Sequence, residues 1–161
     1  MVEIRPADPS DAEAIRDTAR ASWHAAYDDL LGEEVVASTV DEWYDPTGLR
    51  DVMGHSDHVV RVSGNDVVGF AHLGPNPENG RVAELFRIYV RPERWGEGIG
   101  GRLLVAAGTG LEGFDRLALS VLAGNEVGIG FYEKRGFERV GEQIVELGDE
   151  TYREYRYERS L

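Results

Sequence analysis

The chain of 161 residues contains no cysteine. Disulfides, thiolate metal ligands and cysteine nucleophiles are therefore excluded. No apolar run approaches the roughly 18 residues that a membrane-spanning helix needs, and no apolar signal region opens the chain. We therefore expect a cytoplasmic protein with no membrane partner. Linkers rich in proline, glycine or serine are also missing, so residues 1–161 are expected to form a single domain with one core.

Lysine is almost absent. Lys134 is the only lysine among 17 basic residues, which face 30 acidic residues and leave a formal net charge of -13. This balance argues against nucleic acid as a partner. Two explanations of the acidity remain open: adaptation to high salt, where charge is screened and acidic surfaces keep proteins soluble, or an ordinary acidic protein from an arginine-rich genome. Neither explanation identifies a substrate.

Periodicity predicts a mixed α/β domain. Ser10 has the spacing of an N-cap in a capping box, followed by an amphipathic helix to residues 27–30. Further helices are expected at 33–40, 99–111 and 125–135, with a turn or two at 47–53, and strands at 2–5, 59–63, 67–73, 81–90, 114–122, 137–145 and 151–158. The fold class is therefore α/β (α+β), a mostly antiparallel sheet of about seven strands with about four helices. A crossover helix after Val90 makes the fourth and fifth strands parallel.

A glycine-rich turn joins the strand that ends at Val90 to the helix that begins at Ile99. The first turn of a helix carries unpaired N–H groups and the positive end of the helix dipole, and glycines allow an anion to approach the backbone. From Arg87 to Arg102 four arginines face two glutamates, a local balance of +2. The turn therefore predicts a phosphate or pyrophosphate site.

Glycine-rich turns also occur in other kinds of phosphate-binding protein and in connections that bind nothing. This turn is not a Walker A loop, because no Gly-Lys-Ser/Thr follows. A dinucleotide-binding fingerprint belongs after the first strand of an alternating β/α unit, whereas this turn follows the fourth strand. A tight connection without any ligand remains the simplest alternative.

A second segment decides between these interpretations. Asn125 follows the fifth strand, and Phe-Tyr-Glu-Lys-Arg-Gly-Phe occupies residues 131–137. Together with Trp95-Gly96-Glu97-Gly98-Ile99-Gly100, this segment resembles the two signatures of the GNAT superfamily of N-acetyltransferases. The resemblance extends over essentially the whole chain, from the Ile4-Arg5-Pro6-Ala7-Asp8 opening onward.

The resemblance implies acetyl-CoA as cosubstrate, no metal, and a set of cofactor contacts. Backbone groups of two strand residues would pair with the pantetheine arm, the N–H groups of the turn would hold the pyrophosphate, and the Val90 N–H is a candidate oxyanion donor. The implied cofactor-binding residues are Ile88, Val90, Arg94, Trp95, Gly96, Glu97, Gly98, Ile99, Gly100, Gly101 and Asn125. Trp95 stands where the family has Gln or Arg, so Arg94 is expected to supply the cation. Asn125 fits a helix N-cap equally well.

Two residues are implied for catalysis. Tyr132 would protonate the leaving thiolate, since a phenol can serve a sulfur whose thiol has a pKa of about 8.5; the alternative is a core aromatic. Glu84 would remove the proton of the amine, directly or through water; the alternative is a strand carboxylate that faces solvent or pairs with an arginine. His72 is a rival base, because histidine titrates near neutrality.

We therefore expect an N-acetyltransferase that transfers acetyl directly from acetyl-CoA to a primary amine, on a small molecule or on a protein N-terminus or lysine. The alternative is a non-catalytic acyl-CoA-binding module, which would not need Tyr132. Trp23, Tyr27 and Trp43 are candidates for the acceptor pocket or for ordinary core positions. Arg153, Tyr155, Tyr157 and Arg159 alternate on one face of the last strand, which predicts either a homodimer contact or a solvated edge.

Overall fold

The computed structural model describes residues 2–161, so Met1 lies outside it. Seven strands form one sheet in the order β1-β2-β3-β4-β5-β7-β6. The strands are β1 (Ile4–Pro6), β2 (Val59–Ser63), β3 (Gly69–Pro75), β4 (Val82–Val90), β5 (Arg116–Leu122), β6 (Glu138–Leu147) and β7 (Glu150–Ser160). The helices are α1 (Ala12–Leu31), α2 (Glu33–Trp43), α3 (Pro46–Met53), α4 (Ile99–Gly108) and α5 (Glu126–Glu133), with short 3-10 turns at Pro9–Asp11 and Pro92–Arg94. The expected α/β class is confirmed.

The parallel pair predicted from the crossover helix is present. β4 and β5 run parallel with α4 between them in sequence, while the neighbouring pairs on either side are antiparallel. The segment at 47–53, expected to hold a turn or two, is the eight-residue helix α3. Asp45 caps α3, since its side chain accepts a hydrogen bond from the Gly48 N–H at 3.2 Å.

The predicted cap of the first helix is wrong in position. Ser10 lies inside a 3-10 turn whose N-cap is Asp8: the Asp8 Oδ1 accepts from the Ser10 N–H at 2.9 Å, and Asp11 completes the capping box by accepting from the Asp8 N–H at 2.8 Å. The residue before α1 is Asp11, whose side chain makes no cap bond to α1. The aspartate pair forms the same kind of reciprocal box two residues earlier than the predicted Ser/Glu pair. A 3-10 turn therefore precedes α1, which begins at Ala12.

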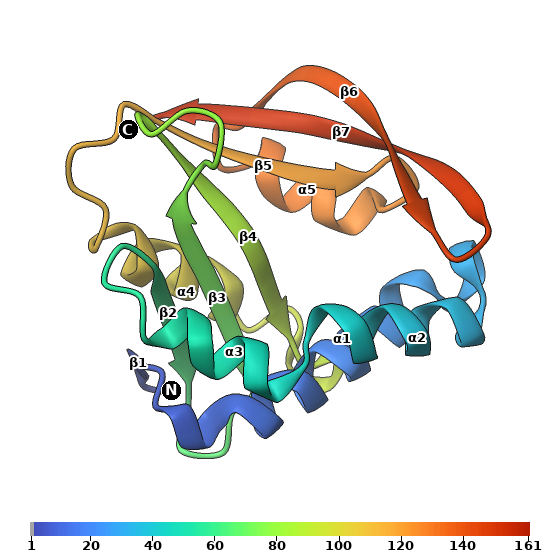
Figure 1. The fold of residues 1–161 in the computed structure, drawn as a ribbon, viewed down its shortest axis with the longest axis horizontal. Coiled ribbons are helices and arrows are strands. Elements are labelled where there is room, and N and C mark those ends of the chain that lie inside the picture. Colours follow the sequence, from blue (N-terminus) through green and yellow to red (C-terminus); the bar gives the residue numbers. More distant parts are fainter. Residues whose placement is uncertain (1) are drawn as a thin grey trace.

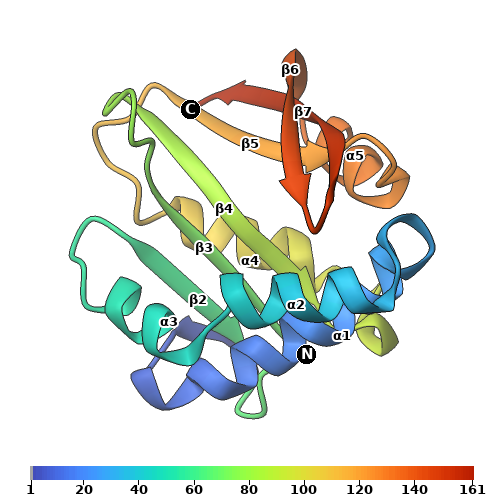
Figure 2. The ribbon, with the colours of Figure 1, turned by 45° about the vertical axis from the view of Figure 1, so that its right-hand side comes forward.

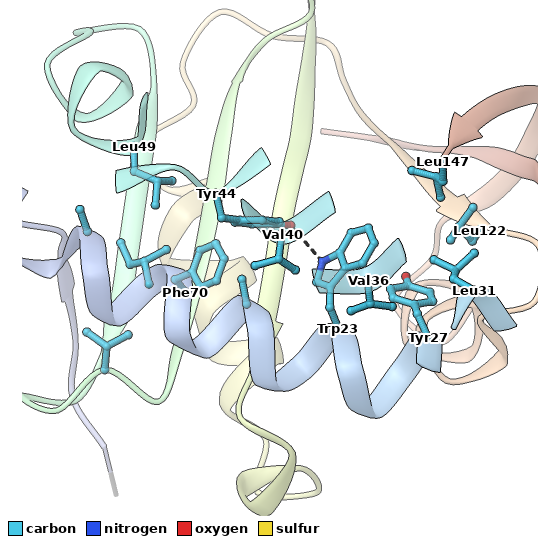
Figure 3. Packing of buried hydrophobic residues seen from close by; sticks show 14 of the residues in the cluster. Trp23, Tyr27, Leu31, Val36, Val40, Tyr44, Leu49, Phe70, Leu122 and Leu147 are labelled. Carbon is cyan, nitrogen blue, oxygen red and sulfur yellow. Dashed lines mark hydrogen bonds between the residues drawn. The ribbon is translucent and has the colours of Figure 1, made fainter. Parts of the chain in front are cut away.

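Two apolar clusters lie on opposite faces of the sheet. On one face, α1 buries Ile15, Ala19, Trp23 and Tyr27 at helical spacing. Figure 3 shows these aromatic side chains pointing toward α2 and the sheet, with the Trp23 indole donating to the Tyr44 hydroxyl at 3.2 Å. On the other face, α4 buries Ile99, Leu103, Leu104 and Ala107 against the strands. Figure 2 shows α1, α2 and α3 on one side of the sheet and α4 on the other.

The sheet divides at its centre. β4 and β5 pair only from Val82 with Arg116 to Glu84 with Ala118, although β4 continues to Val90 and β5 to Leu122. The two strands diverge beyond this point, as Figure 1 shows. A bulge in the β3–β4 pairing sits at the same level, where His72 pairs with Arg87 but Leu73 pairs with Leu85. The divergence leaves the inner edges of two strands unpaired.

The last strand is not an edge. β7 lies between β5 and β6, so the expectation that its Tyr/Arg face is a solvated edge is wrong. Tyr157 is fully buried and its hydroxyl donates to Glu133 at 2.8 Å, while the Arg139 guanidinium lies 3.7 Å from the centre of the Tyr155 ring. The outer strand is β6, most of which is exposed. The homodimer stays a prediction.

Candidate functional site

The glycine turn has the geometry of an anion site. Gly96 (φ 86°) and Gly98 (φ 80°) adopt left-handed backbone, and a Cβ on either would meet nothing within 4 Å. Their lack of a side chain is thus required by conformation, not by crowding. Within residues 2–161, the N–H groups from Gly96 to Gly101 have no acceptor, and the first helical bond runs from the Arg102 N–H to the Gly98 carbonyl at 3.2 Å. These free N–H groups at the start of α4 are suited to a phosphate.

The next two glycines have a different cause. A Cβ on Gly100 would lie 3.4 Å from the Phe131 ring, and a Cβ on Gly101 would lie 2.8 Å from the Arg135 guanidinium. The distance at Gly100 is an ordinary van der Waals contact, whereas the absence of a side chain at Gly101 makes room for Arg135 beside the first turn of α4. Arg135 is stacked 3.7 Å from the centre of the Phe131 ring, and no carboxylate of the described chain lies within 4.0 Å of its nitrogens. Sequence reasoning missed this cation beside the turn, because the contact is made between two helices.

Arg94, expected to supply the cation, is already paired. Its Nε lies 2.8 Å from Glu97 within the turn, and the pair is exposed. Trp95 has its indole N–H engaged as well, donating to the Val90 carbonyl at 2.7 Å. The Ser22 hydroxyl donates to the same carbonyl at 2.6 Å. Trp95 thus ties the turn to the end of β4, and its role as a cofactor contact stays a prediction.

The backbone of β4 faces the divergence at alternate residues. The Arg91 N–H donates to the Val68 carbonyl at 2.8 Å, so this position turns toward β3. Because strand residues alternate, the N–H groups of Ile88 and Val90 turn the other way, into the space that β5 leaves. This is the orientation that the predicted pantetheine pairing needs.

A cavity of about 680 Å³ lies against the divergent strands. It is bounded by α1, the α2–α3 junction, β4, β5 and β7. Its aromatic lining is Trp23, Tyr27, Trp43, Tyr44, Phe86 and Tyr89; its charged lining is Glu42, Asp45, Glu84, Arg87 and Glu154. The predicted pocket residues Trp23, Tyr27 and Trp43 all line it, and two of them are also core residues, since Trp23 is 4% and Tyr27 3% exposed.

Glu84 lies on the cavity wall, but both oxygens of its carboxylate already accept hydrogen bonds. The Arg156 guanidinium donates to both of its oxygens, at 2.7 and 3.0 Å, and the Asn76 amide donates to one at 3.0 Å. Arg156 also donates to Ser120 at 2.9 Å. The hydrogen bonds to Glu84 raise the pKa of Arg156 above its ordinary value. Pairing with an arginine, the alternative given above, is what the geometry shows, and the base role stays a prediction.

The surroundings of His72 make it a weak base. It is buried on β3, and burial, together with Arg87 and His58, lowers its pKa to about 3. Its Nε2 lies 2.9 Å from Nδ1 of His58, while its Nδ1 has no partner among residues 2–161. A histidine with so low a pKa is neutral near pH 7 and binds an additional proton weakly.

Tyr132, on α5, packs against the apolar cluster on the α4 face of the sheet. Its ring stacks on Phe131 with centroids 5.3 Å apart and meets the edge of Phe137 at 5.8 Å. Burial raises the pKa of Tyr132, and the phenols of Tyr27 and Tyr44 raise it further. The phenol is therefore protonated near neutral pH, and its oxygen makes no hydrogen bond to residues 2–161. A protonated, unengaged hydroxyl is what a general acid requires.

Asn125 holds α5 in place. Its Oδ1 accepts from the Gly128 N–H at 2.9 Å, so the N-cap interpretation is confirmed. Its amide group also donates to the Tyr27 hydroxyl of α1 at 2.8 Å. Asn125 thus bridges α1 and α5 across the divergence, and its contact with the cofactor stays a prediction.

The described chain offers neither a metal cluster nor a membrane helix. Among residues 2–161, no three His, Asp or Glu side chains are grouped to hold a metal ion. No helix over the same range has the length and apolar character to cross a membrane.

Known proteins resemble this arrangement. The family model described as Acetyltransferase (GNAT) family matches residues 12–137. Spermidine N(1)-acetyltransferase of Thermoplasma acidophilum is 30% identical over 144 residues, 84% of this chain and 88% of that protein. Mycothiol acetyltransferase of Rhodococcus jostii is 29% identical over 136 residues, 80% of this chain; those residues span only 42% of the length of that relative.

A solved structure agrees over the full length. The PaiA N-acetyltransferase from Thermoplasma acidophilum, crystallised in complex with coenzyme A, superposes with a TM-score of 0.85 at 28% identity, covering 100% of this chain and 99% of that one. The predicted enzyme class and acetyl-CoA as cosubstrate are thereby confirmed. The chain belongs to the acetyltransferase (GNAT) family and is an N-acetyltransferase that uses acetyl-CoA.

Proposed function

We propose that the acceptor is a polyamine-type cation, an aliphatic chain with a primary amine and at least one further positive charge. The charges in the cavity carry this proposal. Glu42, Asp45 and Glu154 line it without an ion-pair partner among residues 2–161, whereas Glu84 has Arg156, and the one basic lining residue is Arg87. A cavity with surplus negative charge attracts a polycation.

The aromatic lining favours the same class of acceptor. Six aromatic side chains border the cavity, and a ring face attracts an ammonium group within about 6 Å. The volume of about 680 Å³ accommodates a small flexible amine. The relative with the spermidine acetyltransferase name supports the choice, since it matches 84% of this chain at 30% identity.

For the cofactor, we assign the pyrophosphate to the free N–H groups from Gly96 to Gly101 and the pantetheine to the backbone of Ile88 and Val90. Two observations support this assignment. Gly96 and Gly98 adopt the left-handed conformation, and the N–H groups of Ile88 and Val90 point into the space between β4 and β5. The amine nitrogen attacks the thioester carbonyl, the carbon–sulfur bond breaks, and the phenol of Tyr132 gives its proton to the sulfur. The proton that the nitrogen loses as the amide forms restores the phenol. The raised pKa of Tyr132, caused by burial, means that the phenol still carries its proton when the thiolate leaves.

The test is an amine panel with acetyl-CoA, read as release of free thiol. We expect kcat/KM for spermidine and for a diamine to exceed that for a monoamine of equal length by about tenfold or more, because a charge-assisted contact contributes about 1.5–3 kcal/mol. Glu42→Gln should reduce that preference. Its matched control is Glu34→Gln, an exposed position in the first turn of the same helix. A monoamine or an amino acid used as well as spermidine would refute the polyamine assignment.

A further inference from the structure

The face of β7 that borders the cavity carries two charged residues of opposite sign. Glu154 and Arg156 lie two positions apart, so their side chains share one face of the strand. Tyr152, two residues earlier, belongs to the apolar cluster under α1 and α2, which fixes this as the face toward the cavity. Tyr157, on the alternate face, lies in the opposite cluster.

A row of polar contacts joins the two strands on either side of β5. Arg156 pairs with Glu84 of β4 and donates to Ser120 of β5 at 2.9 Å. Gln143 of β6 donates to Ser120 at 3.3 Å and to Oε1 of Glu154 at 2.7 Å. One carboxylate therefore stands at each end of the row, and the only guanidinium in it binds Glu84.

The two carboxylates differ in how many hydrogen bonds their oxygens already accept. Both oxygens of Glu84 accept from Arg156, and one also accepts from Asn76. Taking a proton there would break a bidentate ion pair. Glu154 accepts one neutral hydrogen bond, and across residues 2–161 no donor reaches its Oε2 and no cation pairs with it.

Glu154 also shares the cavity wall with Tyr27, which contacts the first residue before the helix that bears the proposed acid. Glu154 lies opposite Leu122 in the β5–β7 pairing, at the end of β5 that borders the cavity. Glu154 and Tyr27 both line the cavity, and the Tyr27 hydroxyl accepts the hydrogen bond from Asn125 at the start of α5. The start of the helix that bears Tyr132 is thus hydrogen-bonded to a residue that shares the cavity wall with Glu154.

We propose that Glu154 is the general base that takes the proton from the acceptor ammonium. The inference rests on the proposed transfer of acetyl to an amine. The ammonium loses one proton to Glu154, which passes it to solvent; the free amine then attacks the thioester carbonyl. The carbon–sulfur bond breaks, sulfur gains a proton from Tyr132, and the second proton leaving nitrogen restores the phenol. Net, acetyl-CoA and an ammonium give an amide, free thiol and one proton.

The test compares carboxylate-to-amide variants over a range of pH. Glu154→Gln should lower kcat about 100-fold near neutral pH, within the range that general acid–base catalysis contributes. Its rate should then rise tenfold per pH unit as the amine loses its proton unaided, while KM for acetyl-CoA stays unchanged. Glu146→Gln, an exposed position on the same hairpin, is the matched control and should behave as wild type.

A second variant separates chemistry from folding. Glu154→Ala should regain rate when formate is added, because a free carboxylate can occupy the vacated space, and Glu146→Ala should show no response. Coenzyme A binding and the thermal midpoint report whether each variant is folded.

Several outcomes overturn the proposal. A Glu154→Gln enzyme with wild-type kcat and a raised KM for the amine would make Glu154 a binding residue. If Glu84→Gln loses the wild-type pH dependence of kcat while Glu154→Gln keeps it, the general base is Glu84. If the wild-type enzyme acetylates no amine, the proposed function is refuted as well. If the wild-type enzyme acetylates an amine and Glu154→Gln has the same kcat and pH dependence, only the role of Glu154 as base is refuted.

Discussion

Replacing Arg156 by methionine removes the guanidinium that pairs with Glu84 while keeping a long apolar stem. The Glu84 side chain is 10% and the Arg156 side chain 23% exposed, so the variant leaves a nearly buried carboxylate without a cation. Breaking a buried pair costs about 3–5 kcal/mol, and the partial exposure of Arg156 places the loss near the lower end, about 3 kcal/mol. For a domain of this size that lowers the thermal midpoint by about 6–12 °C.

The loss should depend on pH in a defined direction. In the variant, the nearly buried carboxylate of Glu84 has no cation, so its negative charge is what destabilises the folded form. Acid neutralises that charge, and the folded form of the variant should therefore regain stability relative to wild type as pH falls. The gap in unfolding free energy between wild type and Arg156→Met should therefore narrow with acidification.

Denaturant unfolding at several pH values measures both effects. The double variant Glu84→Gln with Arg156→Met removes the stranded charge and should recover more than half of the loss. The reasoning fails if Arg156→Met lies within 1 kcal/mol of wild type, or if the double variant is no more stable than the single one. Either result would mean that water reaches Glu84 freely and that the ion pair contributes little.

Two further predictions concern the acid and the turn. Tyr132→Phe should lower kcat by about 100-fold or more with coenzyme A affinity unchanged, because only the proton donor is removed; steady-state kinetics and calorimetric titration measure the two, and unchanged turnover would exclude Tyr132 as the acid. Gly98→Ala should cost about 1–2 kcal/mol of stability and weaken coenzyme A binding, since alanine resists the φ of 80° that aims the free N–H groups. Its control is Gly130→Ala, in the middle of α5 with open space around the added methyl, which should be neutral or stabilising. Equal effects of the two changes on coenzyme A affinity would contradict the assignment of the turn.

Local patterns in the sequence predicted the elements that depend on neighbours along the chain. The strand–turn–helix order around Gly98 and the N-cap at Asn125 follow from the conformational preferences of single residues, and both are present. The same logic misplaced the first cap. Ser10 and Asp8 are both good caps, and choosing between them required knowing that a 3-10 turn precedes the helix.

Contacts across the sheet could not be predicted in this way. Glu84 and Arg156 are 72 residues apart and meet because β7 enters the sheet beside β5, a matter of strand order that periodicity does not encode. The same holds for Arg135, which reaches the turn only through the packing of α5 on α4. The adaptation to salt and the homodimer remain predictions from composition and pattern.

The close approach of α4 and α5 has a consequence for the history of this chain. Of the four motif glycines, Gly101 is the one at which an added Cβ would clash, 2.8 Å from the Arg135 guanidinium, whereas a Cβ on Gly100 would make an ordinary van der Waals contact with Phe131. A lineage that gains a side chain at 101 must move the end of residue 135 or shorten it. Positions 101 and 135 should therefore co-vary among relatives, while 96 and 98 remain glycine regardless.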